Sequence, residues 1–263
     1  MKIFRRVLLV LLIIFVIVAS IFFFIGFGAY SNVLKEKPLV DRISEITNKE
    51  HFVKFDDMSK DYINAVIAIE DHRFYDHGSV DFIAVIRAIF NNIKDNEMEQ
   101  GGSTITQQVS KNIFFTQERT LSRKLGELFG AADLEKNYSK NEIFELYANT
   151  VYFGDGYYGI YAASKGYFNK EPKDLNLYEA SMLAGIPNAP SIYSPTVNPE
   201  LTKQRQKQVL NSMLTYGYIS ESDKSKVLDE ASKSLQDNIS PTTNTSTNTN
   251  TTNQTNTLNT SIN

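Results

Sequence analysis

The sequence predicts a mainly α protein with one N-terminal membrane-spanning helix. Two observations support this fold class. Apolar residues recur at helical spacing between residues 52 and 238, without the sustained alternation of apolar and polar residues that is typical of strands. The run VLLVLLIIFVIVASIFFFI, residues 7–25, contains no charged residue. With 263 residues and 42% hydrophobic content, the chain can form one main domain with appendages.

The N-terminal run has the length of a membrane span. Its nineteen residues would extend about 28 Å as a helix, close to the thickness of a bilayer's hydrocarbon core. Lys2, Arg5 and Arg6 precede it, so the positive-inside rule places residues 1–6 in the cytoplasm and the rest outside. A cleaved signal peptide is the alternative, but its apolar region is usually shorter, and no A-x-A site follows. We expect an uncleaved single-pass plasma-membrane anchor over residues 7–29.

The remaining elements are expected in a fixed order. A juxtamembrane linker, residues 30–51, leads to a folded domain over residues 52–238. Each helix expected in that domain combines an apolar face with a start or stop signal. These helices begin near Ser59, Ser79, Ser103–Thr104, Leu121, Ser139 (with Glu142 as a capping box) and Pro199, the last ending at Gly217. Residues 239–263 are almost entirely Thr, Asn and Ser, a composition that predicts a disordered tail.

Composition excludes several classes of function. The net charge of −3 argues against a general nucleic-acid binder. The chain has no cysteine, which rules out disulfides, thiolate catalysis and cysteine-ligated metals. It has three histidines, too few for a His-rich zinc site.

The stretch IEDHRFYDHG, residues 69–78, places two acids at the end of an apolar helix. Such an acid pair is commonly a solvated helix end or an ion-pair partner. Partial burial beside aromatic residues could instead raise the pKa of Glu70, as suits a general base.

The stretch QGGSTITQQ, residues 100–108, combines two glycines with a helix start. The glycines allow close backbone approach, and the free N–H groups after Ser103 and Thr104 could receive an anion. The alternative is a flexible turn with a Ser/Thr cap. The stretch lacks the lysine of a P-loop, so nucleotide binding is weakly supported.

The stretch KNIFFTQERTLSRKLGE, residues 111–127, is locally basic in an acidic chain. Arg123 and Lys124 lie four and three residues before Glu127, so both can pair with it on one helix face. The alternatives are a surface charge ladder that contributes little, or a phosphate site.

Taken in order, the motifs resemble a known family. EDHRFYDHG, GGSTITQQ, RKLGE, KNEIFELYANTVYFG and RQKQVLNSM are similar to the five ordered motifs of the peptidoglycan glycosyltransferases. This family includes monofunctional membrane-anchored enzymes and the polymerising module of class A penicillin-binding proteins. The resemblance covers about residues 52–219. Two departures, Ala148 for a usual leucine and Asn169 for a common glycine, are expected to affect packing rather than chemistry.

The resemblance implies a lysozyme-like, two-lobed fold and a reaction. Enzymes of this family polymerise lipid II through β-1,4 links with inversion, and the growing glycan strand on undecaprenyl pyrophosphate is the donor. Glu70 would be the general base, and Glu127 the second catalytic glutamate near the pyrophosphate. The implied substrate-binding residues are Asp71, Phe74 and His77, which would also shape the Glu70 loop, and Gly102, Ser103, Thr104, Gln107, Gln108, Lys111, Arg119, Arg123 and Lys124.

The resemblance also sets expectations for cofactors and partners. Glu127 could hold a divalent cation, Mg²⁺ or Mn²⁺, and no organic cofactor is expected. Partners would be lipid II, the growing strand and the plasma membrane, with penicillin-binding, division or elongation proteins as further candidates. Two alternatives stay open: a muramidase, which would leave the basic cluster without a task, and a catalytically silent lipid II-binding scaffold. The chain contains no S-x-x-K, so no penicillin-binding module is expected within it.

Overall fold

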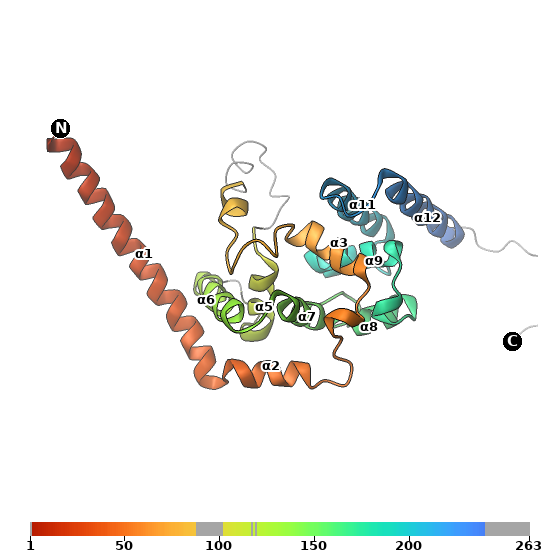
Figure 1. Cartoon of the computed structure of the whole chain (residues 1–263), viewed down its shortest axis with the longest axis horizontal. Helices are drawn as coiled ribbons and strands as arrows, with labels where there is room; N and C mark the ends of the chain where they lie inside the picture. Colours follow the sequence, from red (N-terminus) through yellow and green to blue (C-terminus); the bar gives the residue numbers. More distant parts are fainter. Residues whose placement is uncertain (1, 88–101, 117, 119, 240–263) are drawn as a thin grey trace, which may run out of the picture.

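The computed structural model describes residues 2–87, 102–116, 118 and 120–239 (Figure 1). In these residues no strand is present, and the one β-bridge joins Tyr152 to Tyr158. The prediction of a mainly α fold is therefore confirmed. The longer helices are α1 (Lys2–Glu36), α2 (Leu39–Thr47), α3 (Lys60–Glu70), α5 (Ile105–Phe114), α6 (Leu121–Asn137), α7 (Lys140–Thr150), α8 (Ile160–Phe168), α9 (Leu177–Gly185), α11 (Pro199–Thr215) and α12 (Glu221–Ile239).

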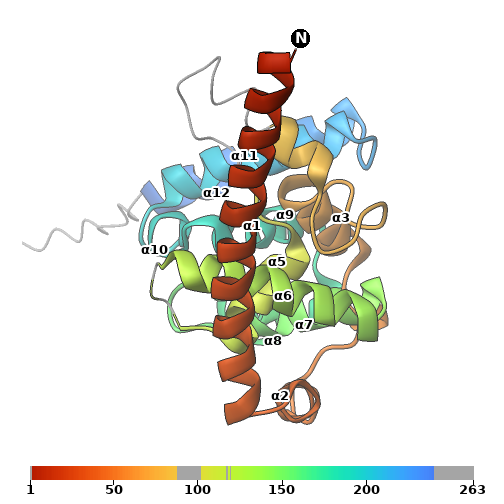
Figure 2. The same ribbon diagram turned by 90° about the vertical axis from the view of Figure 1, so that its left-hand side faces the viewer.

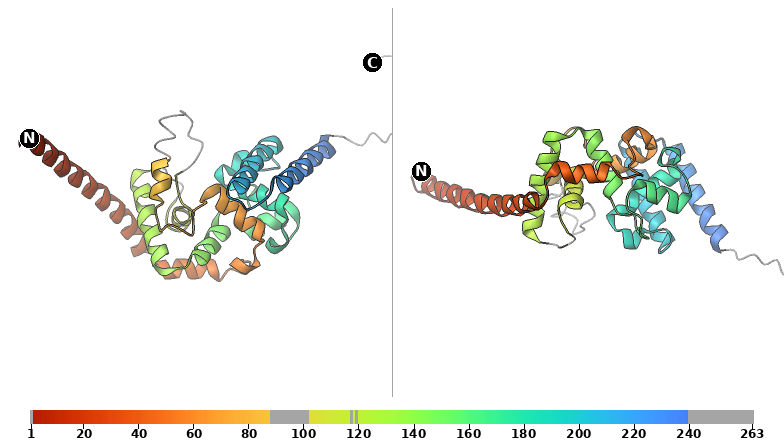
Figure 3. Two further views of the ribbon diagram at one scale, coloured as in Figure 1. Left: turned by 45° about the horizontal axis from the view of Figure 1, so that its top comes forward. Right: turned by 90° about the horizontal axis from the view of Figure 1, so that it is seen from below.

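Helix α1 is long and apolar enough to cross a membrane. Its first half extends away from the folded body, and its second half runs along α6 (Figures 2 and 3). Phe23 and Phe27 pack edge-on against Phe129 of α6, with ring centroids 5.1 and 6.0 Å apart. A Cβ atom on Gly26 would lie 2.8 Å from that of Leu125, so the close approach of the two helices requires glycine there.

The segment 30–51, expected to be a linker, is largely helical and belongs to the folded body. It contains the end of α1 and all of α2, which packs against α7. Leu39, Ile43 and Ile46 are buried and form part of the hydrophobic core. The spacing of these three residues, four and then three positions apart, is a helical pattern that could have identified α2 in the sequence.

The helices of the body form two groups. Helices α5, α6 and α7 pack on one another, and α1 and α2 lie against them. Helices α3, α9, α11 and α12 form the second group, in which α3 and α11 both pack on α9 (Figure 1). The core is continuous between the groups through buried aromatic residues such as Phe144 of α7, which contacts Tyr62 of α3.

Local signals set several helix ends. Ser59 accepts a hydrogen bond from the Tyr62 amide at the start of α3, and the Ser139–Glu142 capping box starts α7, both as expected. Asn169 ends α8 with a φ of 53°, which explains why glycine suits this position and why asparagine is tolerated.

The helix expected to start at Ser79 begins two residues later than predicted. Ser79 does not cap a helix: the helix that starts at residue 82 begins after Asp81, whose carboxylate accepts from the Ile83 and Ala84 amides at 2.9 Å. A carboxylate is the stronger acceptor at a helix start, where it also meets the positive end of the helix dipole. The rest of that expected helix, and residues 240–263 of the expected tail, lie outside the described residues.

Candidate active site

A cleft of about 700 Å³ separates the two helix groups. Its walls come from the C-terminal end of α3 and the segment after it, from α5 and α6, and from α11 with the 3-10 helix η3 (Ile186–Asn188) and α10 (Pro190–Tyr193). Ten of the residues expected at a site line it: Glu70, Asp71, Gly102, Ser103, Thr104, Gln107, Gln108, Lys111, Lys124 and Glu127. Segments that are distant in the sequence thus meet around one polar cavity.

Glu70 is the last residue of α3, and its side chain is 11% exposed. One carboxylate oxygen, Oε2, accepts a hydrogen bond of 2.7 Å from Gln108 Nε2 of α5. The other, Oε1, lies 3.6 Å from Nη2 of Arg205 of α11. The apolar face of α3 fixes the backbone, and contacts from both walls of the cleft fix the carboxylate.

Burial raises the pKa of Glu70 above that of an ordinary glutamate. The Gln108 hydrogen bond and the charges of Arg205 and Lys111 oppose this shift without cancelling it. A carboxylate in such surroundings binds a proton more strongly than one in water, which is the property that a general base requires.

The wall formed by α5 and α6 carries a cationic cluster, which we define as Lys111, Arg123 and Lys124. Lys111 and Lys124 line the cleft, whereas Arg123, which was also assigned to substrate binding, does not. Lys124 Nζ lies 2.9 Å from Glu127 Oε2 and donates to Ser103 Oγ at 2.8 Å. Arg123 Nη1 lies 3.3 Å from Glu127 Oε1. Burial lowers the pKa of Lys111, and the charge of Glu127 opposes that shift.

Glu127 is 1% exposed, whereas Lys124 is half-exposed, so the Arg123–Glu127–Lys124 group is a network around a buried carboxylate and not the surface ladder that sequence reasoning left open. Removing one member of such a network leaves an uncompensated buried charge. The group can present cationic donors to an anion in the cleft. Arg119, also expected in this role, lies outside the described residues.

Glu127 does not fit the role of a divalent-cation ligand in this arrangement. Both of its oxygens already face cationic side chains, Lys124 and Arg123. Mg²⁺ and Mn²⁺ prefer oxygen ligands and several of them. Among the described residues, the group with metal-ligand spacing is Asp71, His77 and Asp81, and its oxygens are paired with protein donors as described next.

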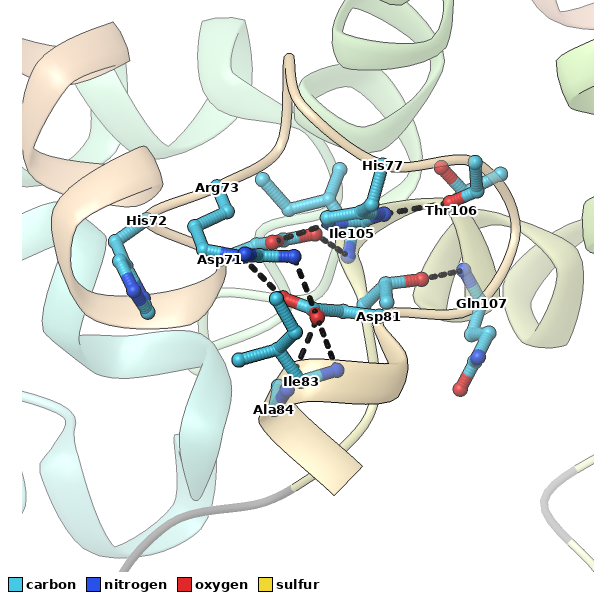
Figure 4. A network of polar contacts seen from close by, with 12 residues as sticks. Asp71, His72, Arg73, His77, Asp81, Ile83, Ala84, Ile105, Thr106 and Gln107 are labelled. Atoms are coloured by element: carbon cyan, nitrogen blue, oxygen red, sulfur yellow. Dashed lines mark hydrogen bonds and ion pairs between the residues drawn. The ribbon is translucent and has the colours of Figure 1, made fainter. Parts of the chain in front are cut away.

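Asp71 fastens the loop after α3 to the start of α5 (Figure 4). Its Oδ1 lies 2.7 Å from His77 Nε2, and its Oδ2 accepts from the Ile105 amide at 3.1 Å. The Gln107 amide bonds to Thr104 Oγ1 at 3.1 Å. The sequence left open whether the N-terminus of α5 receives an anion or carries a Ser/Thr cap. Protein acceptors occupy these two amides, and the Thr104 hydroxyl is one of them.

A second set of hydrogen bonds, made by Arg73, Asp81 and Gln107, holds the same loop (Figure 4). Arg73 donates two hydrogen bonds to Asp81, at 3.0 and 2.9 Å. The Ser79 carbonyl accepts from Gln107 Nε2 at 2.8 Å. The loop therefore has a defined shape, which sets the edge of the cleft beside Glu70.

Phe74 and His77 do not line the cleft, although both were assigned to substrate binding. Phe74 is fully buried, with its ring beneath Lys140 Nζ at 4.6 Å. The His77 side chain is 5% exposed and paired with Asp71. Both side chains support the Glu70 loop from within, which is the other role that the sequence suggested for them.

Sequence reasoning missed one wall of the cleft. The stretch RQKQVLNSM was recognised as a motif, but none of its residues was assigned a role. Arg205, Gln208, Asn211 and Ser212 of α11 line the cleft, together with His72, Arg87, Asn188, Tyr193 and Tyr216. The polar residues at positions 205, 208, 211 and 212 recur at helical spacing, a signal that could have identified this face.

The chain is similar in sequence to penicillin-binding proteins. The chain is 47% identical over 182 residues to penicillin-binding protein 1A of Neisseria flavescens, covering 69% of this chain and 23% of that protein. It is 47% identical over 174 residues to penicillin-binding protein 1F of Bacillus subtilis, covering 66% of this chain and 24% of the relative. The chain thus spans about a quarter of the length of the curated relatives it matches.

The chain also matches a solved structure and a protein family. The crystal structure of penicillin-binding protein 1A from Haemophilus influenzae is 28% identical, with a TM-score of 0.34 over 48% of this chain and 16% of that chain. The family described as transglycosylase matches residues 37–214, which include all the described cleft residues except Tyr216, and it supports the expected lysozyme-like fold class. The chain belongs to the transglycosylase family.

Proposed function

We propose that the protein is a peptidoglycan glycosyltransferase that polymerises lipid II into β-1,4-linked glycan strands. The observation that supports this most is the pairing, in one cleft, of a buried carboxylate of raised pKa with a cationic cluster on the wall formed by α5 and α6. An inverting transfer from a pyrophosphate donor needs both: a base for the attacking hydroxyl, and cations for the leaving group.

In the proposed reaction, Glu70 takes the proton from the 4-hydroxyl of the acceptor sugar, and the oxygen of that hydroxyl attacks the anomeric carbon of the donor. The bond to undecaprenyl pyrophosphate breaks, and the electron pair leaves with the pyrophosphate. Lys111 and Lys124, which line the cleft, then stabilise the developing charge, and Arg123 adds its charge from behind Glu127. The leaving group therefore needs no protonation by an acid.

Glycan polymerisation from purified lipid II, with full-length protein in detergent, tests the proposal. Glu70→Gln should lower the rate roughly a hundredfold to ten-thousandfold, because general-base catalysis contributes about that much. Glu179→Gln is the matched control: its carboxylate is 10% exposed, compared with 11% for Glu70, but it does not line the cleft. The control should polymerise nearly as well as the wild type.

The same assay separates the alternatives. A muramidase would release muropeptides from purified cell wall and would make no polymer. A silent scaffold would bind lipid II and make no product in either test. Equal rates for wild type and Glu70→Gln would move the general base to another residue.

We further propose that α1 crosses the plasma membrane once, with residues 1–6 in the cytoplasm and the cleft outside. Lys2, Arg5 and Arg6 before the apolar run support this orientation. Because the chain has no cysteine, single cysteines can be labelled cleanly. A membrane-impermeant maleimide should label Lys173→Cys on intact cells and Ile3→Cys only after lysis; the reverse pattern would contradict the orientation.

A further inference from the structure

Arg205 places a buried guanidinium group against the carboxylate of Glu70. It projects from α11, which packs on α3, and its side chain is 10% exposed. The distance from Nη2 to Glu70 Oε1 is 3.6 Å. The contact joins one wall of the cleft to the end of the helix that carries the proposed base.

The guanidinium is held in place by groups other than Glu70. Its Nη1 donates to Gln208 Oε1 at 2.9 Å, and its Nε donates to the Gly185 carbonyl at 3.4 Å. Its Cζ lies 5.8 Å from the centre of the Tyr193 ring. These contacts fix the charge in position whether or not Glu70 is ionised.

Gly185 also makes room for this side chain. A Cβ atom at position 185 would lie 2.9 Å from Arg205 Cγ, closer than such contacts occur. Substitution there would move the arginine without changing its charge. The site thus offers a way to separate the position of Arg205 from its chemistry.

Arg205 faces a different carboxylate from the one that the cationic cluster faces. Arg123 and Lys124 pair with Glu127, whereas Arg205 pairs with Glu70. The other charged or titratable groups that face Glu70 are Asp71 next in the chain, Lys111 of α5, Tyr62 of α3 and Tyr147 of α7. Asp71 opposes ionisation of Glu70, and Lys111 and Arg205 favour it.

We propose that Arg205 is a positioning residue that orients the Glu70 carboxylate and holds it in its charged form, with Gln208 and Gly185 holding Arg205 in turn. This inference rests on the proposed role of Glu70 as general base. With Gln108 on one oxygen and Arg205 on the other, the carboxylate has one preferred orientation in the cleft. A nearby positive charge stabilises the carboxylate over the neutral acid.

The pH dependence of polymerisation tests this role. In Arg205→Met, which removes the charge and keeps a similar length, the acid limb of the kcat/KM profile should move up by about one pH unit or more. In Arg205→Lys, which keeps the charge, the limb should stay near its wild-type position while the plateau falls. Gly185→Ala should move the limb upward by a smaller amount. An Arg205→Met profile with a lower plateau and an unmoved limb would overturn the inference.

A second measurement does not depend on activity. Glutamate labelled with ¹³C at the side-chain carboxyl reports its own titration by NMR, and the signal lost in Glu70→Gln identifies Glu70. The titration of Glu70 should move to higher pH in Arg205→Met, and an unchanged titration would overturn the inference. If wild-type protein makes no polymer, the proposed function fails while this titration still decides the role of Arg205. If Arg205→Met does not fold, Gly185→Ala is measured in its place.

Discussion

The Asp71–His77 pair gives a prediction whose size and pH dependence both follow from the structure. The two side chains are each 5% exposed, and His77 Nε2 lies 2.7 Å from Asp71 Oδ1. Burial alone would lower the pKa of His77, but the hydrogen bond and charge of Asp71 outweigh it and raise the pKa above 6.5. The pair is therefore ionic in the folded protein at mildly acidic pH.

The sign of the pH effect follows by linkage. Because the folded protein binds the His77 proton more tightly than the unfolded chain does, this stabilisation is fully present below about pH 6.5 and is lost as pH rises through the folded pKa. Breaking a buried pair by removing one partner costs about 3–5 kcal/mol. Asp71→Asn should therefore be strongly destabilising, and His77→Gln should cost less because Asp71 keeps its bond from the Ile105 amide.

A double-mutant cycle of Asp71→Asn and His77→Gln isolates the pair from its surroundings. We expect a coupling energy of about 1–3 kcal/mol at pH 6 and a smaller one at pH 9. The measurement is urea unfolding in detergent, followed by circular dichroism at both pH values. A coupling energy that is equal at the two pH values, or larger at pH 9, would refute the ionic interpretation.

Two further predictions concern the anchor and the base. Gly26→Ala should destabilise the protein by about 1–3 kcal/mol, because its new methyl group would meet Leu125. Gly28→Ala, with open space around it, should be neutral or slightly stabilising; thermal melting in detergent that shows equal effects would contradict the packing of α1 on α6. Because the pKa of Glu70 is raised, its charged form opposes folding, and Glu70→Gln should melt above the wild type at pH 8 with an advantage that shrinks as the pH falls toward 4.5. An advantage independent of pH would show that burial of the charge is not its cause.

The helix starts could be predicted because their determinants are local. The Ser139–Glu142 capping box and the Ser59 cap involve side chains and amides within three residues of one another. Ser79 failed as a cap because Asp81, two residues further on, offers a carboxylate that Arg73 holds in place. A cap depends on competition among neighbouring acceptors, which the spacing of residues alone does not rank.

The site could be predicted in part. The motifs correctly indicated which segments meet at a cleft, since Glu70, Gln108 and Lys124 all line it. The burial of Glu127 could not be predicted in this way, because the spacing of Arg123, Lys124 and Glu127 is the same for an exposed ladder and for a network around a buried carboxylate. The Arg205–Glu70 contact also depends on the packing of α11 on α3, which no local pattern encodes.

The continuity of α1 has a geometric consequence for the proposed anchor. One helix, Lys2–Glu36, contains both the apolar run and the segment that packs on α6, and α6 carries Lys124 and Glu127. Each residue inserted between the two parts would rotate the span by about 100° and lengthen the helix by about 1.5 Å. Insertion of four residues would leave nearly the same face of the apolar run above the cleft, but it would move the cleft about 6 Å along the helix axis relative to that run. With α1 as the proposed anchor, the register of this single helix would set the height of the cleft above the bilayer and the direction in which it opens.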